Sequence, residues 1–167
     1  MRIDEILKLL EAPEDGTFAG VHFSNASVQA LQAFTEANNI PNPTPPDEYH
    51  ATLLFSHTPI KDYKPWGSYK QALTAIPKYA TIFGDGDEKA LVIVLDAPGL
   101  VKRHKYLMSK HPEATWDHDE FIPHVTLSYD AGETDPNSLD VADIGPLDIV
   151  DEYGDDIEPD WEQNLDD

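Results

Sequence analysis

Residues 48–56 read EYHATLLFS, and a second stretch, residues 122–130, reads IPHVTLSYD. Both contain the pattern His-x-Thr-Leu, first at His50 and again 74 residues later at His124. β-Branched and aromatic residues are frequent in both stretches, which predicts a strand at each. A single His-x-Thr pattern is a weak signal, but two copies followed by the same leucine indicate a shared role.

The spacing of the pattern decides which side chains lie together. Positions i and i+2 of a strand project from the same face, so His50 lies beside Thr52, and His124 beside Thr126. If the two predicted strands are neighbours, two imidazoles and two hydroxyls line one concave surface.

Paired imidazoles and hydroxyls suit phosphodiester cleavage. One imidazole can take a proton from the nucleophile while the other gives a proton to the leaving oxygen, because imidazoles titrate near neutrality. Hydroxyls can donate to the non-bridging phosphate oxygens, where charge must be stabilised in the transition state. The sequence therefore predicts His50, Thr52, His124 and Thr126 as catalytic residues, with no metal and no cofactor.

The rest of the chain places these strands in an α+β pattern. Alternating apolar residues predict strands over 17–24, 72–84 and 90–97, and helical spacing predicts helices over 1–12, 26–39 and 97–111. Ser24 or Asn25 is expected to cap the second helix, and the last two of these strands are expected to form a hairpin. The order gives two loosely similar halves, each ending in a His-x-Thr-Leu strand.

Composition limits the possible partners. The 167 residues suit one domain, 1–167, and contain no cysteine. No stretch is apolar enough to span a membrane, and residues 1–12 are too charged for a signal peptide. With 11 basic and 32 acidic residues the net charge is −21, which disfavours duplex DNA and long RNA. Any nucleotide partner should be small.

The acidic C-terminal segment, residues 148–167, has two interpretations. Its charge is typical of a mobile, solvated tail. Large apolar residues, Ile149, Tyr153, Ile157 and Trp161, interrupt that charge and favour a segment that folds back onto the body. The pattern leaves both open.

Two polar clusters compete for a role. His111, Asp117, His118 and Asp119 are an alternative metal site, although solvated loops of this composition are commoner. Residues 102–105, KRHK, form the only basic cluster of the sequence and are expected on the exposed side of a helix; the alternative is that one of them helps draw in a phosphate.

The two motifs, with Pro123 directly before the second, resemble those of the two-histidine phosphoesterases. That superfamily has a LigT-like fold, in which two pseudo-symmetric lobes with antiparallel sheets and flanking helices surround a central cleft. The opening MRIDEILKLL, the two motif strands and the acidic C-terminus are similar to the anti-CBASS nucleases of T-even-type bacteriophages, over most of the chain. The resemblance implies metal-independent destruction of the cyclic di- and trinucleotides by which bacteria signal phage infection.

The resemblance also implies binding residues and a location. In that family aromatic groups stack on the bases and an acidic C-terminal segment lies near the ligand. The candidates here are Phe18, Tyr79, Glu152, Tyr153 and Trp161. This chain is longer at residues 111–120, where the family's pattern does not transfer. The expected location is the host bacterial cytosol, and the oligomeric state stays open.

Three other functions remain possible from the sequence. A 2′,3′-cyclic phosphodiesterase for RNA ends would use the same residues, but its charge would repel tRNA. A nucleotide sponge would bind without cleaving, and an acidic decoy would mimic DNA. Neither needs two proton-transfer groups. For the enzyme, surrounding negative charge is expected to raise the pKa of both motif histidines above about 6.5.

Overall fold

The computed structural model describes residues 16–84 and 89–157. The predicted helix over 1–12 and Trp161 lie outside these ranges. The described strands are β1 (Gly16–Phe23), β2 (Ala51–Ser56), β3 (Gly67–Phe83), β4 (Ala90–Asp96), β5 (His124–Ser128) and β6 (Leu147–Ile157). The described helices are α2 (Asn25–Ala37) and α3 (Pro98–Lys110), with short 3-10 turns at Pro46–Glu48, Pro136–Ser138 and Val141–Asp143. The predicted α+β class is confirmed.

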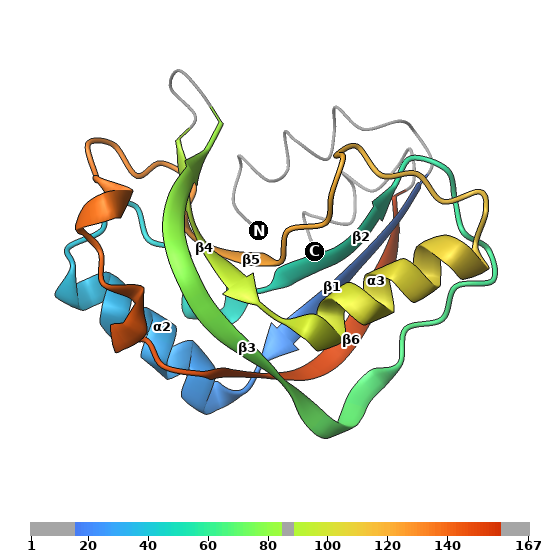
Figure 1. Cartoon of the computed structure of the whole chain (residues 1–167), viewed down its shortest axis with the longest axis horizontal. Coiled ribbons are helices and arrows are strands. Elements are labelled where there is room, and N and C mark those ends of the chain that lie inside the picture. The colour runs from blue at the N-terminus through green and yellow to red at the C-terminus, as the bar shows by residue number, and fades with distance from the viewer. Residues whose placement is uncertain (1–15, 85–88, 158–167) are drawn as a thin grey trace.

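The strands form one antiparallel sheet in the order β2-β1-β6-β3-β4-β5. β2 and β5 are at opposite ends of this order, yet they approach each other because the sheet is strongly curved (Figure 1). The chain just before β2 is bonded to β5, since the Thr44 amide donates to the Leu127 carbonyl at 2.8 Å. Curvature therefore brings the two motif strands together, which is the arrangement that the predicted site needs.

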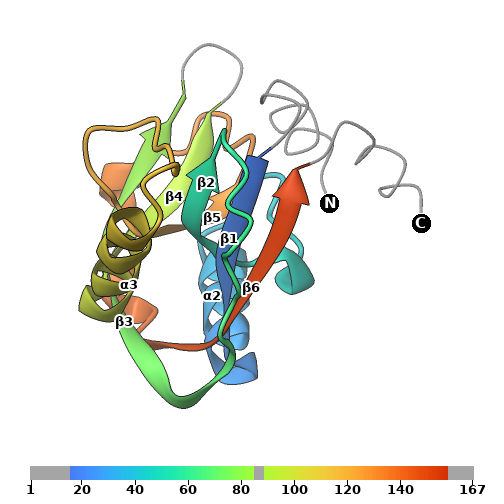
Figure 2. The ribbon, with the colours of Figure 1, turned by 90° about the vertical axis from the view of Figure 1, so that its right-hand side faces the viewer.

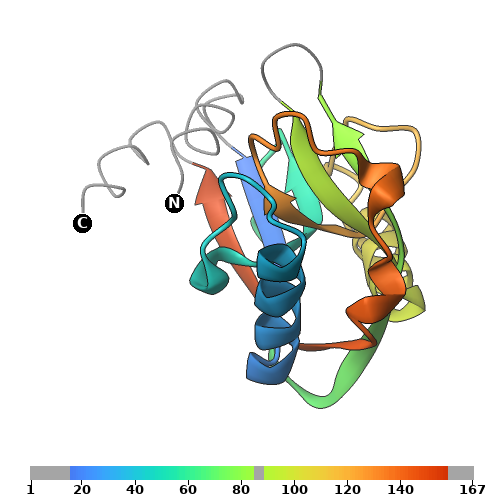
Figure 3. The ribbon, with the colours of Figure 1, turned by 90° about the vertical axis from the view of Figure 1, so that its left-hand side faces the viewer.

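The two halves repeat the same order of elements. β1, α2 and β2 form the first unit, and β4, α3 and β5 form the second. In each unit the two strands pair antiparallel, and the motif strand lies at the edge of the sheet. Figure 1 shows α2 and α3 toward opposite ends of the long axis, and Figures 2 and 3 show them from the two sides.

A β-bulge falls at the same position in both motifs. In the first, Thr52 pairs with Gly20 and the second residue after it, Leu54, pairs with Ala19, so Leu53 is the extra residue. In the second, Thr126 pairs with Val92 and Ser128 with Leu91, so Leu127 is the extra residue. Both extra leucines are fully buried. The shared leucine of the sequence pattern is thus the bulge residue.

Local sequence explains where the helices start and which face they bury. The Ser24 hydroxyl accepts a bond from the Ser27 amide at 3.2 Å, which caps α2 as predicted. α2 buries Leu31 and Phe34, at helical spacing. α3 begins at Pro98, a residue that suits the first helical turn because its missing N–H has no partner there.

β6 occupies the middle of the sheet, between β1 and β3. Leu147 and Ile149 of β6 are fully buried, and Asp148 and Asp151 are exposed or half-buried. Figure 2 shows β6 lying beside β1 along its length. Of the C-terminal segment, residues up to Ile157 therefore form a strand of the sheet, and residues 158–167 lie outside the described residues.

The basic cluster of α3 was expected on the exposed side of the helix, and for two of its members that prediction is wrong. Arg103 and His104 are both 6% exposed, whereas Lys102 and Lys105 are exposed. Arg103 forms two hydrogen bonds of 2.9 Å with Glu152. A buried partner on another element, which the local charge pattern does not reveal, accounts for Arg103, and His104 is bonded to the carbonyl of Leu53. Within the described residues no helix has the length and apolarity of a membrane span.

Candidate active site

His50 and His124 stand at the starts of the two motif strands. His124 is the first residue of β5, and His50 directly precedes Ala51, the first residue of β2. The predicted strand over 48–56 starts later than expected because Pro46–Glu48 forms a 3-10 turn. Both histidines are half-buried.

Both imidazoles are held in the same way. The Nδ1 of His50 lies 2.9 Å from the carbonyl of Glu48, and the Nδ1 of His124 lies 2.8 Å from the carbonyl of Ile122. A carbonyl can only accept, so each Nδ1 carries a proton and donates it. In the neutral ring the Nε2 atom then has the lone pair. Each histidine is therefore ready to take or give a proton through Nε2.

The two imidazoles are electrostatically coupled. Burial lowers the pKa of His124, and the nearby His50 and His118 rings lower it further, while the bond to Ile122 opposes them. The expectation that surrounding negative charge raises this pKa is wrong for His124, because desolvation of the imidazolium dominates. His124 is therefore neutral at pH 7, the state required of a general base.

Thr52 lies in β2 and Thr126 lies in β5. Thr52 is opposite Gly20 on β1, and Thr126 is opposite Val92 on β4. Both are half-buried. No hydrogen bond joins either hydroxyl to another residue within 16–84 or 89–157. Both hydroxyls can therefore donate to a ligand without breaking a contact between described residues.

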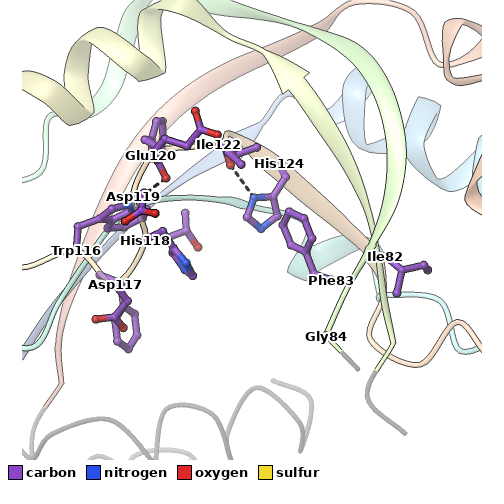
Figure 4. Close-up of a pocket in the computed structure, with 13 residues that line it drawn as sticks. Ile82, Phe83, Gly84, Trp116, Asp117, His118, Asp119, Glu120, Ile122 and His124 are labelled. Atoms are coloured by element: carbon purple, nitrogen blue, oxygen red, sulfur yellow. Dashed lines mark hydrogen bonds between the residues drawn. The ribbon is translucent and has the colours of Figure 1, made fainter. Parts of the chain in front are cut away.

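A pocket of about 720 Å³ opens beside Thr52 and His124, whereas His50 and Thr126 are not among its described lining residues. Its size is within the range of small-molecule sites, roughly 300 to 1,000 Å³. Figure 4 shows His118 and His124 pointing into the same open space. The described lining consists of Thr52, Phe55, Ile82, Phe83, Gly84, the loop residues 116–122, and His124.

The pocket loop is bonded to the end of β2. The His57 Nε2 lies 2.7 and 2.8 Å from the two carboxylate oxygens of Asp117. The His57 amide donates to the Thr115 hydroxyl at 2.7 Å, and the Thr115 amide donates to the Ser56 hydroxyl at 3.0 Å. These contacts hold the segment before the second motif against the first motif strand.

Residues 15–164 of the sequence match the family described as anti-CBASS protein Acb1. The chain belongs to this family. The anti-CBASS protein Acb1 of Acinetobacter phage Ac42 is 31% identical over 153 residues, which cover 89% of this chain and 95% of that protein. The protein of the same name from Enterobacteria phage T4 is 29% identical over 150 residues, covering 90% and 93%. That of Vibrio phage KVP40 is 30% identical over 162 residues, covering 97% and 99%.

One of the aromatic residues predicted to bind substrate in this Acb1-family chain, Phe18, contacts His50, and a second, Tyr153, contacts Phe18. The ring of Phe18 meets the His50 ring edge-on, with centroids 6.1 Å apart. The rings of Phe18 and Tyr153 are also neighbours, with centroids 5.9 Å apart, and the ring of Tyr153 stacks on that of His22, with centroids 4.2 Å apart. The four rings form a continuous row that starts at one motif histidine. Base stacking on this row stays a prediction.

Tyr79 lies in the other half of the sheet. It pairs with Val94, which in turn pairs with His124, so the three side chains share a face. Tyr79 is 49% exposed and can present its ring to a ligand. The ring of Phe83, on the same strand as Tyr79, meets the His124 ring edge-on, with centroids 4.9 Å apart. Each motif histidine therefore has a phenylalanine at its side.

Glu152 has a different environment from the one its predicted role suggested. It is 2% exposed, and its carboxylate accepts from Arg103, the hydroxyls of Tyr63 and Tyr69, and the Trp66 amide. Burial alone would raise the pKa of Glu152, but the hydrogen bonds from Arg103 and Tyr63 hold it below its usual value. A substrate contact at Glu152 would require these bonds to open.

The alternative metal site in the pocket loop is not supported by the geometry. Among the described residues no group of three or more His, Asp or Glu side chains is arranged to hold a metal ion. Asp117 is paired with His57, and the Nδ1 of His111 lies 3.6 Å from a carboxylate oxygen of Glu113.

His104, His57 and Phe83 contribute to the site but were not predicted from the sequence. His104 donates through Nδ1 to the Leu53 carbonyl at 2.8 Å, and the other two make the contacts already described. Each lies outside the His-x-Thr-Leu pattern and reaches the site only through tertiary contacts. No signal along the sequence distinguishes them from ordinary core or loop residues.

Proposed function

We propose that this protein is a metal-independent phosphodiesterase that cleaves cyclic di- and trinucleotides in the host bacterial cytosol and so counters CBASS signalling. The observation that carries the proposal is the matched pair of histidines, each with its Nδ1 bonded to a backbone carbonyl. Binding alone would not need two imidazoles that both leave Nε2 open for proton transfer. The names of the family and of its phage members support the anti-CBASS role.

His124 is the better candidate for the general base, since its lowered pKa keeps it neutral. In the proposed first step its Nε2 takes the proton of a ribose 2′-OH, and the 2′ oxygen attacks the adjacent phosphorus. The bond from phosphorus to the 5′ oxygen breaks, and the Nε2 proton of His50 passes to that oxygen. The product is a linear nucleotide that ends in a 2′,3′-cyclic phosphate.

A second step can open the cyclic phosphate. Water then attacks the phosphorus as His50 takes its proton, and His124 returns a proton to the departing 2′ oxygen. In both steps the hydroxyls of Thr52 and Thr126 donate to the non-bridging oxygens, whose negative charge grows in the transition state. No metal is needed for either step.

We also assign the chain to the two-histidine phosphoesterases, with a LigT-like, two-lobed fold. The support is the repeated strand-helix-strand unit on each side of the sheet, with a bulge at the same motif position in both. A common origin of the two halves would place matching histidines on facing strands without further adjustment.

The direct test is incubation of the protein with cyclic di- and trinucleotides of different bases and linkages, in EDTA, followed by mass spectrometry. A short RNA with a 2′,3′-cyclic end and a short DNA duplex serve as comparisons. We expect cyclic nucleotides to become linear products at a rate that EDTA does not change. Binding without any product would support a sponge, and activity restored only by added metal would exclude the proposed mechanism.

A further inference from the structure

We propose that His104 of α3 is a positioning residue that sets the geometry of the first catalytic motif and connects it to the pocket loop. The inference rests on the proposed function for its kinetic consequences. His104 is 6% exposed, and its Nδ1 lies 2.8 Å from the carbonyl oxygen of Leu53. Since the carbonyl can only accept, Nδ1 carries the proton.

The Leu53 carbonyl belongs to the bulge that aims Thr52 and His50. The extra residue of a bulge is left out of the ladder, and bulges near active sites commonly redirect neighbouring side chains. A buried carbonyl without a donor is costly. The His104 ring supplies a donor at this position, so the conformation of the backbone between Thr52 and Leu54 depends on a side chain of another element.

In the second motif the bulge carbonyl has a backbone donor instead of a side-chain donor. The carbonyl of Leu127, its bulge residue, accepts from the Thr44 backbone amide at 2.8 Å. The backbone amide of residue 44 supplies this bond independently of the side chain at that position. Between the two bulge carbonyls, within the described residues, it is that of the first motif whose donor is a side chain that mutation can remove, which predicts an asymmetric effect on His50 and His124.

The ring of His104 also supports the pocket. It stacks on Phe121 with centroids 4.2 Å apart and planes 8° from parallel, and it meets the edge of Trp116 at 4.6 Å. Phe121 and Trp116 both line the pocket. One buried ring therefore contacts the first motif through its nitrogen and the loop before the second motif through its faces. Burial lowers the pKa of His104, so these contacts are made by the neutral ring.

Two substitutions separate these contacts. In His104→Asn the amide nitrogen takes the place of Nδ1, so the bond to Leu53 can persist while the stacking is lost. In His104→Phe the stacking persists and the donor is lost. Lys105→Ala, on the exposed side of the same helix, is the matched control.

The experiment compares kcat and KM of the variants on a cyclic dinucleotide that the wild type cleaves. We expect His104→Phe to lower kcat by about 10²-fold with little change in KM, because a misplacement of about 1 Å costs that much. His104→Asn should keep kcat within a few-fold and raise KM, since the pocket loop loses its support. Wild-type kcat in His104→Phe, or equal losses of kcat in the two variants, would overturn the proposal.

A measurement independent of turnover distinguishes failure of this proposal from failure of the proposed function. Histidine-ring NMR across a pH titration reports His50 and His124 separately in the folded protein. We expect His104→Phe to change the ring chemical shifts of His50 much more than those of His124, and His104→Asn to leave the shifts of His50 close to wild type. An unchanged His50 in His104→Phe, or a changed His50 in His104→Asn, would contradict a positioning role even if no cyclic nucleotide were cleaved.

Discussion

At His50 and at His124, a backbone carbonyl bonded to Nδ1 determines which ring nitrogen can transfer a proton. By accepting from Nδ1 at 2.9 and 2.8 Å, the carbonyls of Glu48 and Ile122 leave proton transfer to Nε2 in both rings. The sequence pattern predicted these two histidines and the two threonines as catalytic residues from strand periodicity, and that role stays a prediction. The pattern could not reveal that His124 is desolvated, since burial depends on Phe83 and on the loop before the motif.

The pH dependence of turnover tests the environment of His124. As pH rises through its lowered pKa, His124 loses a proton and becomes a base, so the acid limb of kcat should lie below about 6.5. Phe83→Ala should admit water and move this limb upward toward the usual value. The measurement is kcat from pH 4.5 to 9. An acid limb above pH 7 in the wild type, or one unaffected by Phe83→Ala, would contradict the assignment.

The role of the Thr52 and Thr126 hydroxyls can be tested by substitutions that keep the shape of the side chain. Thr→Val at either position removes the donor to the phosphate, so kcat should fall by about 10²-fold, as when one oxyanion donor is lost. Thr→Ser keeps the donor and should retain most of the activity. If both Val variants turn over at the wild-type rate, the hydroxyls do not stabilise the transition state.

At the scale of elements, local sequence predicted α2, α3 and the strands β1 to β5, with β3 starting five residues earlier than expected, and the predicted helix over 1–12 lies outside the described residues. Two features did not follow from local sequence. The bulges at Leu53 and Leu127 appear only when each strand has a partner. β6 is strongly acidic, and its charge pattern suited a tail equally well. It forms a central strand because Leu147 and Ile149 are buried and because Glu152 forms an ion pair with Arg103 on α3. Such long-range pairing leaves no periodic trace in the sequence.

Gly20 provides a test of how β1 and β6 pack at the site. A methyl group at Gly20 would lie 2.8 Å from the Tyr153 hydroxyl oxygen and 2.9 Å from its ring, so the ring must move. We expect Gly20→Ala to raise KM for cyclic nucleotides and to lower stability by about 1–3 kcal/mol. Enzyme kinetics and urea unfolding measure the two effects.

Ser24→Ala is the control for Gly20→Ala. It removes the α2 cap and should lower stability by about 1 kcal/mol with KM unchanged, because α2 does not line the pocket. If Gly20→Ala leaves KM at the wild-type value while lowering stability as Ser24→Ala does, Tyr153 has no part in binding.

At the scale of the whole molecule, a chain with a net charge of −21 holds a fully buried carboxylate. Glu152 on β6 is bonded to Arg103 on α3 and to Tyr63 and Tyr69 before and within β3. The carboxylate thus joins three parts of the fold. The many exposed acids repel one another, but this one is neutralised by a guanidinium and three further donors.

Removing Arg103 should therefore be far more damaging than removing an exposed charge. Arg103→Met leaves Glu152 buried and unpaired, at a cost of about 3–5 kcal/mol. Arg103→Met combined with Glu152→Gln should recover part of the loss, because no charge is left behind. Urea unfolding at pH 7 gives these free energies, with Lys102→Met as the control. Equal stability of Arg103→Met and Lys102→Met would refute the role of the pair.

The same carboxylate predicts acid sensitivity. The pKa of Glu152 is lower in the folded state than in the unfolded chain, so its contribution is complete above the unfolded value of about 4.3. It is lost as pH falls through the lower, folded value. Wild type should therefore lose more stability than Glu152→Gln between pH 5 and 3. Parallel loss in both proteins would indicate that other groups control acid unfolding.

The most direct test of the account is the turnover of cyclic nucleotides, in EDTA, by His50→Ala, His124→Ala and the double variant. Each single variant should remain folded, keep its affinity for the substrate within a few-fold, and lose about 10²- to 10⁴-fold in kcat. The double variant should be little worse than either, because the two rings act in one proton-transfer sequence. A folded single variant that cleaves at close to the wild-type rate would contradict the two-histidine mechanism.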